Sequence, residues 1–169
     1  MFEDDFNDGL DDLWEQTLGK WQVANRQLTT VGNCEWATLT LGDFDWSNYA
    51  VEVDCHTPLL YSNMGIYVRQ QEDGSDMGFF YQSGSYYIPR FLRKEGGNFM
   101  SVAKASQRGG FHSPDAKVRL EVRGNESVAY INGSEYVSTF DSTFSSGRVA
   151  LTMQCSANTF DNFKVTALD

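Results

Sequence analysis

A strict alternation of apolar and polar residues is the strongest restriction that this sequence places on its fold. It runs without a break through residues 49–56, 117–123, 149–155 and 163–167. A period of two places successive side chains on opposite faces of a β-strand, so one face packs on a core and the other meets solvent. Shorter stretches of the same kind lie at residues 21–23, 27–30, 37–41, 65–69, 78–82, 86–88 and 127–131. The chain is therefore predicted to consist mainly of short strands.

Turn-forming residues separate these segments at the spacing typical of antiparallel sheets. Asn132-Gly133 is the clearest hairpin signal, because both residues tolerate positive φ. Only residues 8–15 carry apolar residues at helical spacing, and we expect one or two helical turns there. No linker, repeat or shift in composition divides the chain. Residues 1–169 are therefore predicted to form a single all-β domain, either a sandwich or a barrel.

The charge balance is acidic and narrows the range of partners. The 169 residues include 13 Lys and Arg against 23 Asp and Glu, which gives a formal net charge of −10. Phosphate contacts need clustered cations, so neither nucleic acid nor an anionic membrane surface is the expected partner. Hydrophobic residues make up 41% of the chain, which excludes a disordered protein. No apolar run approaches the ~20 residues of a membrane span.

The compartment and the cysteine pairing are left open by the sequence. Met1 is followed by acidic residues, not by the basic and apolar regions of a signal peptide. The chain is thus either cytoplasmic or a domain of a longer secreted protein. Cys34, Cys55 and Cys155 are odd in number and lack zinc-site spacing, so at most one disulfide joins two of them. Cys55 lies in an alternating segment and is expected to be a small buried apolar residue.

A series of short motifs follows in order along essentially the whole chain. The motifs are Phe2-Glu3-Asp4-Asp5-Phe6, Gly19-Lys20-Trp21-Gln22-Val23, Gly65-Ile66-Tyr67-Val68-Arg69, Gly124-Asn125-Glu126-Ser127-Val128-Ala129-Tyr130-Ile131-Asn132-Gly133, Ser146-Gly147-Arg148-Val149-Ala150-Leu151 and Phe160-Asp161-Asn162-Phe163-Lys164-Val165. In this order they resemble the concanavalin A-like jelly rolls of the laminin-G and DUF1080 sort. They also resemble the levan-type carbohydrate-binding modules attached to glycoside hydrolases. The resemblance implies an antiparallel β-sandwich of the jelly-roll type. It implies less about function, because this fold hosts lectins, hydrolases and adhesive domains.

The resemblance also implies a structural calcium ion. In such sandwiches the two terminal strands often pair side by side, which would bring Glu3 and Asp5 close to Asp161. Carboxylate oxygens are the ligands that calcium takes. The alternative is a solvated acidic edge without a metal ion.

Sugar recognition needs aromatic platforms together with polar groups that bind vicinal hydroxyls. Both kinds of residue occur on the outward phases of the middle segments. The predicted ligand-binding residues are Glu52, Asp54, Arg69, Tyr81, Tyr86 and Arg90. Central to this prediction is that Glu52 and Arg69 point outward from the same layer and hold one monosaccharide together. The alternative is ordinary cross-strand pairing on a solvated sheet. The predicted function is a non-catalytic carbohydrate-binding module that recognises a polysaccharide or oligosaccharide.

Two other functions remain open. The first is a glycoside hydrolase of the DUF1080 sort, because Glu52 and Asp54 are two residues apart on one strand, roughly 6–7 Å at the backbone. The Glu-x-Asp-x-x-Glu strand of glucanases with this fold is absent, however. The second is an adhesive or structural sandwich with a protein partner. For a binding module we expect an extracellular setting, with the chain tethered to a catalytic domain in a secreted parent protein.

Overall fold

The computed structural model describes residues 1–58, 62–82, 89–105 and 115–169, and in this part of the chain every regular element is a β-strand. The strands are β1 (Phe2–Asp4), β2 (Glu15–Leu18), β3 (Trp21–Ala24), β4 (Gln27–Thr30), β5 (Trp36–Leu41), β6 (Tyr49–His56), β7 (Asn63–Gln70), β8 (Asp76–Gln82), β9 (Arg90–Glu95), β10 (Asn98–Lys104), β11 (Asp115–Arg123), β12 (Glu126–Ile131), β13 (Ser134–Phe140), β14 (Arg148–Gln154) and β15 (Thr159–Ala167). Among the described residues no helix is long and apolar enough to cross a membrane.

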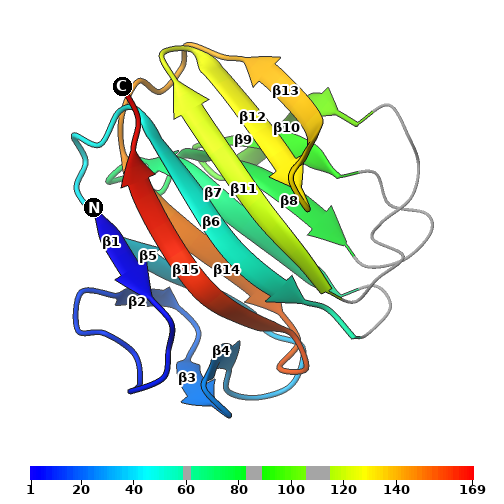
Figure 1. The fold of residues 1–169 in the computed structure, drawn as a ribbon. Helices are drawn as coiled ribbons and strands as arrows, with labels where there is room; N and C mark the ends of the chain where they lie inside the picture. The colour runs from blue at the N-terminus through cyan, green and yellow to red at the C-terminus, as the bar shows by residue number, and fades with distance from the viewer. Residues whose placement is uncertain (59–61, 83–88, 106–114) are drawn as a thin grey trace.

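The strands form two antiparallel sheets that pack face to face (Figure 1). The eight-stranded sheet has the order β13-β12-β11-β6-β15-β4-β3, and β1 pairs with β15 beside this path. The seven-stranded sheet has the order β10-β9-β8-β7-β14-β5-β2. The predicted all-β antiparallel sandwich is therefore confirmed.

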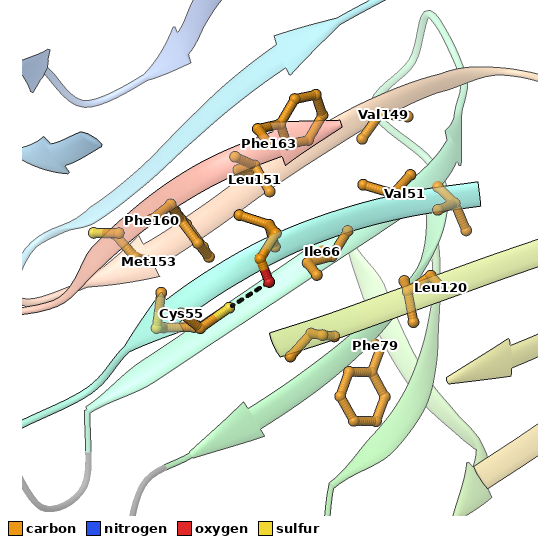
Figure 2. Close-up of a cluster of buried hydrophobic side chains, with 14 of the residues drawn as sticks. Val51, Cys55, Ile66, Phe79, Leu120, Val149, Leu151, Met153, Phe160 and Phe163 are labelled. Carbon is orange, nitrogen blue, oxygen red and sulfur yellow. Dashed lines mark hydrogen bonds between the residues drawn. The ribbon is translucent and has the colours of Figure 1, made fainter. Parts of the chain in front are cut away.

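The core lies between the two sheets and is built by the alternating segments. Val51 and Leu120 point into it from the eight-stranded sheet, and Ile66, Phe79 and Leu151 point into it from the seven-stranded sheet (Figure 2). All are at most 1% exposed, and each such side chain contributes about 1.5–3 kcal/mol through the burial of apolar surface. The alternation thus decides which face of each strand the core covers.

The helical turns predicted for residues 8–15 are wrong. Asp11 instead begins a turn, in which its Oδ1 accepts a hydrogen bond from the Leu13 amide at 2.8 Å and its carbonyl accepts one from the Trp14 amide at 3.1 Å. Aspartate side chains compete with helix formation by bonding the backbone two residues ahead in this way. Strand β2 starts directly after this turn.

Three local expectations agree with the structure. The terminal strands do lie side by side, with Phe2 opposite Val165 in the β1–β15 pair. The hairpin between β12 and β13 turns at Asn132, which has a φ of 49°. Cys55 is 3% exposed and packs in the core, as Figure 2 shows. The remaining two cysteines are joined in a Cys34–Cys155 disulfide.

Candidate functional site

The predicted partnership of Glu52 and Arg69 is wrong, because the two residues belong to different sheets. Glu52 lies on β6 of the eight-stranded sheet, and Arg69 lies on β7 of the seven-stranded sheet. The Arg69 side chain is fully buried, and its guanidinium donates to the carbonyl oxygens of Phe144 (2.9 Å) and Ser47 (3.3 Å). Arg69 therefore fixes two loops from inside and is not available to a ligand at the surface.

A β-bulge explains why the alternation fails at Arg69. In the β7–β14 pair Tyr67 lies opposite Ala150 and Gln70 lies opposite Arg148, so β7 has one more residue than its partner between these positions. Arg69 itself has a φ of 55°, and its amide donates to the Tyr49 hydroxyl at 2.8 Å. A bulge of this kind re-aims the side chains that follow it. The outward phase set by Tyr67 therefore does not continue to Arg69.

Glu52 and Asp54 do share the outer face of the eight-stranded sheet, but both are engaged in ion pairs. Glu52 pairs with Arg119 directly across the strand, and Asp54 pairs with Lys117 at 2.9 Å. Asp54 also accepts a hydrogen bond from the Asn162 amide at 2.9 Å. These contacts are ordinary cross-strand pairs of opposite charge. Each carboxylate of the predicted hydrolytic pair therefore has a cationic partner.

The remaining predicted sugar ligands fall on or near the seven-stranded sheet. The backbone of Tyr81 lies in β8, but its side chain and the whole of Tyr86 lie outside the described residues. Arg90 begins β9, is half-buried and lies directly opposite Phe80 of β8. Residues that lie opposite one another in an antiparallel pair point to the same face. Arg90 and Phe80 therefore share one face of this sheet.

The carboxylates predicted to bind calcium are engaged in local contacts. Glu3 pairs with Lys164 at 2.6 Å, and Asp5 accepts hydrogen bonds from the backbone and side-chain amides of Asn7 at 3.1 and 2.6 Å. Asp161 accepts a bond from the Asn162 backbone amide at 2.8 Å. Within the described ranges no three Asp, Glu, His or Cys side chains are grouped so that they would hold a metal ion. The calcium ion stays a prediction.

A groove of about 490 Å³ runs across the outer face of the seven-stranded sheet. Its apolar lining is Leu18, Trp36, Tyr67, Phe80, Leu92 and Phe99. Its polar lining is Thr38, Gln70, Asp76, Lys94 and Thr152. Trp36 on β5 and Phe99 on β10 are 41% and 58% exposed, whereas Tyr67 and Phe80 between them are 9% and 7% exposed. The groove thus has an aromatic floor and an exposed aromatic ring on either side.

Two glycines determine the shape of this floor. Gly78 lies opposite Tyr67, and Gly65 lies opposite Phe80, in the β7–β8 pair. A Cβ added at Gly78 would lie 2.2 Å from the Tyr67 ring, and one added at Gly65 would lie 3.2 Å from the Phe80 ring. Each ring therefore lies over the glycine across from it instead of standing upright, and the floor stays low and flat.

Asp76 is the one acidic side chain in the described lining of the groove. It is 3% exposed, and its Oδ1 has no hydrogen-bond partner among the described residues. Burial raises the pKa of Asp76 to about 7, although the Lys94 charge and the Gln70 amide both act to lower it. Lys94 lies directly opposite on β9, and its ammonium sits 5.8 Å from the centre of the Phe99 ring. A buried oxygen without a donor is costly unless something bound in the groove supplies one.

Comparison by sequence gives no family: no family model matches the chain, and no curated protein matches it. Comparison by structure gives close matches. The carbohydrate-binding module CBM66 from Bacillus subtilis superposes with a TM-score of 0.78 at 14% identity, over 92% of this chain and 96% of that one. The exoplasmic domain of VIP36, in a form bound to Ca²⁺ and Man3GlcNAc, superposes with a TM-score of 0.75 at 6% identity, over 99% and 88% of the two chains.

An enzyme also shares this fold. The GH43 protein BlXynB from Bacillus licheniformis matches 98% of this chain with a TM-score of 0.70 at 12% identity, but the match covers 39% of the longer protein. At such low identities the likeness concerns the fold. The chain has the fold of a concanavalin A-like jelly roll, and the proteins that share this fold include a carbohydrate-binding module, lectin-like domains and glycoside hydrolases.

Proposed function

We propose that this protein is a non-catalytic carbohydrate-binding module and that its saccharide lies in the groove on the outer face of the seven-stranded sheet. The observation that carries the proposal is Asp76, which lines the groove and whose buried Oδ1 has no partner among the described residues. A sugar hydroxyl is a donor of the right kind for this oxygen. Binding would then satisfy a group that the empty groove leaves unsatisfied.

The aromatic floor supports the same proposal. The rings of Trp36 and Phe80 lie 5.9 Å apart at an angle of 33°, so together they offer a broad apolar surface. The C–H faces of a pyranose or furanose pack on such rings, while hydroxyls at the sugar edge reach polar groups beside them. Gln70, Asp76, Lys94 and Thr152 are the polar groups placed around this floor. The groove is open to solvent, and we expect affinities in the micromolar to millimolar range.

The number of carboxyl groups favours binding over hydrolysis. A carboxyl whose pKa is raised by burial, as that of Asp76 is, resembles the general acid of a glycosidase. Glycoside hydrolysis needs a second carboxylate on the other side of the scissile bond. Asp76 has no acidic companion in the described lining, and residues 59–61, 83–88 and 106–114 contain neither Asp nor Glu. Asp73 is near enough to raise the pKa of Asp76, but it does not line the groove. The one carboxyl of the described lining can orient a sugar but cannot supply both catalytic roles.

The setting that we propose is extracellular, with the module tethered to a catalytic domain. The Cys34–Cys155 disulfide supports this setting, because such bonds persist in oxidising compartments. A tethered module raises the local concentration of substrate around its enzyme, so a modest affinity is sufficient.

The proposal is tested by calorimetry and affinity electrophoresis against soluble polysaccharides that include levan, xylan, mannan, galactan and β-glucan. Trp36→Ala and Asp76→Asn are each expected to weaken binding about tenfold, because one removes a stacking ring and the other the charged acceptor. Phe140→Ala is the matched control, since Phe140 is 78% exposed on β13 of the other sheet.

Three outcomes would contradict the proposal. The first is that no polysaccharide binds, and the second is that Phe140→Ala weakens binding as much as Trp36→Ala does. The third is the release of reducing ends from a bound polysaccharide, which would identify the protein as an enzyme.

A further inference from the structure

The groove on the seven-stranded sheet crosses the strands and does not follow any one of them. Its described lining includes at least one residue from every strand of this sheet. Phe99 lies on β10 and Leu18 lies on β2, and these two strands are the edges of the described sheet. The two edges are six strand spacings apart, or ~29 Å along the sheet. The groove therefore extends from one edge of the sheet to the other.

Two aromatic subsites lie far apart in this groove. Trp36 and Phe80 form the first subsite, with their ring centres 5.9 Å apart. Phe99 forms the second; it lies opposite Lys94, which in turn lies opposite Asp76. Phe80 is four residues from Asp76 on β8, and β8 is two strand spacings from β10, so the backbones of Phe80 and Phe99 are roughly 16 Å apart. This distance is longer than one sugar unit.

The rings do not shorten this distance. The Phe80 ring lies over Gly65 of β7, and β7 is on the opposite side of β8 from β10. The Phe99 ring stays beside β9, because its centre is 5.8 Å from the Lys94 ammonium. Asp76, with its unpartnered Oδ1, shares a strand with Phe80 and a cross-strand row with Phe99. A single sugar ring therefore cannot contact both aromatic subsites.

Beyond the first subsite the groove continues to the β2 edge. The residues that follow Phe80 in register on the next three strands are Gly65, Thr152 and Thr38. Leu18 of β2 lies opposite Thr38 and is 53% exposed. Residues directly opposite one another share one face of the sheet, so this row continues the floor. A site for a chain end has a wall beyond the terminal sugar, whereas the described groove reaches an edge strand on both sides.

We propose that the groove binds a linear polysaccharide along its interior, with several consecutive sugar units lying across the strands between β10 and β2. This inference rests on the proposed carbohydrate-binding function and adds the class of ligand, which is an extended chain and not a terminal sugar. One unit stacks on Trp36 and Phe80, and a unit further along the chain stacks on Phe99. A hydroxyl near the second subsite donates to Asp76. These contacts reinforce one another only when the same chain reaches them all.

The first test measures affinity against chain length. Oligosaccharides of two to eight units, prepared from levan, xylan, mannan, galactan and β-glucan, are titrated by calorimetry and, for millimolar affinities, by NMR. For the glycan that binds, affinity should rise at least about tenfold between two and five units, because the longer chain reaches the second aromatic subsite. Equal affinity for two and five units overturns the inference, since one subsite would then account for all of the binding.

The number of protein molecules bound to one polysaccharide chain is an independent measure. A long linear chain of the same glycan should bind many protein molecules in a sedimentation experiment, because every stretch of its interior is a site. Reduction of the chain end with borohydride should leave the affinity unchanged. Binding of one protein molecule per chain overturns the inference in favour of recognition at a chain end.

Two variants test whether the aromatic subsites are separate. Phe99→Ala and Trp36→Ala should each weaken binding of the five-unit ligand at least about threefold. At most one of them should weaken binding of the two-unit ligand, because two units do not reach both subsites. Phe140→Ala on the other sheet is the matched control and should change neither affinity.

Thermal melting checks that these variants fold, which we expect because Phe99 and Trp36 are 58% and 41% exposed. The inference is overturned if Phe99→Ala leaves the affinity for the five-unit ligand unaltered. It is also overturned if both variants weaken the two-unit ligand equally.

The results separate this inference from the proposal on which it rests. If short and long oligosaccharides bind equally, or if only chain ends are bound, the inference fails and carbohydrate binding stands. If neither the oligosaccharides nor the polysaccharides bind, the proposed function fails and the inference fails with it.

Discussion

Asp76→Asn is expected to make the protein more stable at pH 8 while it weakens sugar binding. The folded protein raises the pKa of Asp76 from 3.8 to about 7, mainly through burial. At about 1.4 kcal/mol for each pKa unit, holding this group ionised in the folded state costs about 4 kcal/mol. Asparagine carries no charge and has nearly the same shape, so it avoids this cost. Binding weakens because the charged acceptor is lost.

The sign of the effect follows from proton linkage. The folded protein holds the Asp76 proton more tightly than the unfolded chain does, so this group makes the wild-type protein less stable as pH rises from about 4 to about 7. The groups that face Asp76 are Lys94, Gln70 and Asp73, and the variant leaves them in place. The difference in unfolding free energy between variant and wild type should therefore be small at pH 4 and grow to about 2–4 kcal/mol in favour of the variant at pH 8.

Urea unfolding of both proteins at pH 4, 6 and 8 measures this difference, and thermal melting gives an independent value. A gain of this size corresponds to roughly 5–15 °C in melting temperature for a domain of this length. The reasoning is refuted if the difference is the same at all three pH values, or if the variant is the less stable protein at pH 8.

Three further predictions concern the floor of the groove, the buried arginine and the metal. Gly78→Ala places a methyl group 2.2 Å from the Tyr67 ring, so we expect the free energy of unfolding to fall by about 1–3 kcal/mol and sugar binding to weaken. Unchanged affinity for the sugar would contradict the role given to the flat Tyr67 ring. Arg69→Ala leaves the carbonyl oxygens of Ser47 and Phe144 without their donor, so the free energy of unfolding should fall by about 3 kcal/mol. The affinity of the folded variant for sugar should be unchanged. A loss of this affinity at an unchanged melting temperature would show that Arg69 belongs to the binding site. EDTA should lower the melting temperature and added calcium should restore it, and an unaltered melt would refute the calcium prediction.

The alternating pattern predicts strands and burial but does not assign a strand to a sheet. The pattern of residues 49–56 and 117–123 predicts the buried faces of β6 and β11, which the structure confirms at Val51 and Leu120. It contains no information on which strands pair, because pairing is set by contacts distant in sequence. For this reason Glu52 and Arg69, each on the polar phase of its own segment, could be assigned to one layer although they lie in two.

The groove could have been anticipated only in part. A glycine precedes an aromatic residue by two positions in both Gly65-Ile66-Tyr67 and Gly78-Phe79-Phe80. When two such segments pair in antiparallel fashion, each ring meets the glycine of the other, which is a signal that sequence reasoning had available. Asp76 gave no such signal. It follows the turn residues Asp73-Gly74-Ser75, where an aspartate is expected to face solvent. In the structure it is buried beside Gln70 of β7 and opposite Lys94 of β9.

The pairing of β1 with β15 has a practical consequence for how the protein can be attached to other molecules. Both terminal strands belong to the eight-stranded sheet (Figure 1). The groove opens on the outer side of the other layer. An affinity tag, a resin or a fluorescent reporter fused at either end therefore leaves from the far side of the sandwich. Immobilised copies should keep the groove accessible whichever end is fixed, so binding can be measured on a sensor surface with either orientation as a check on the other.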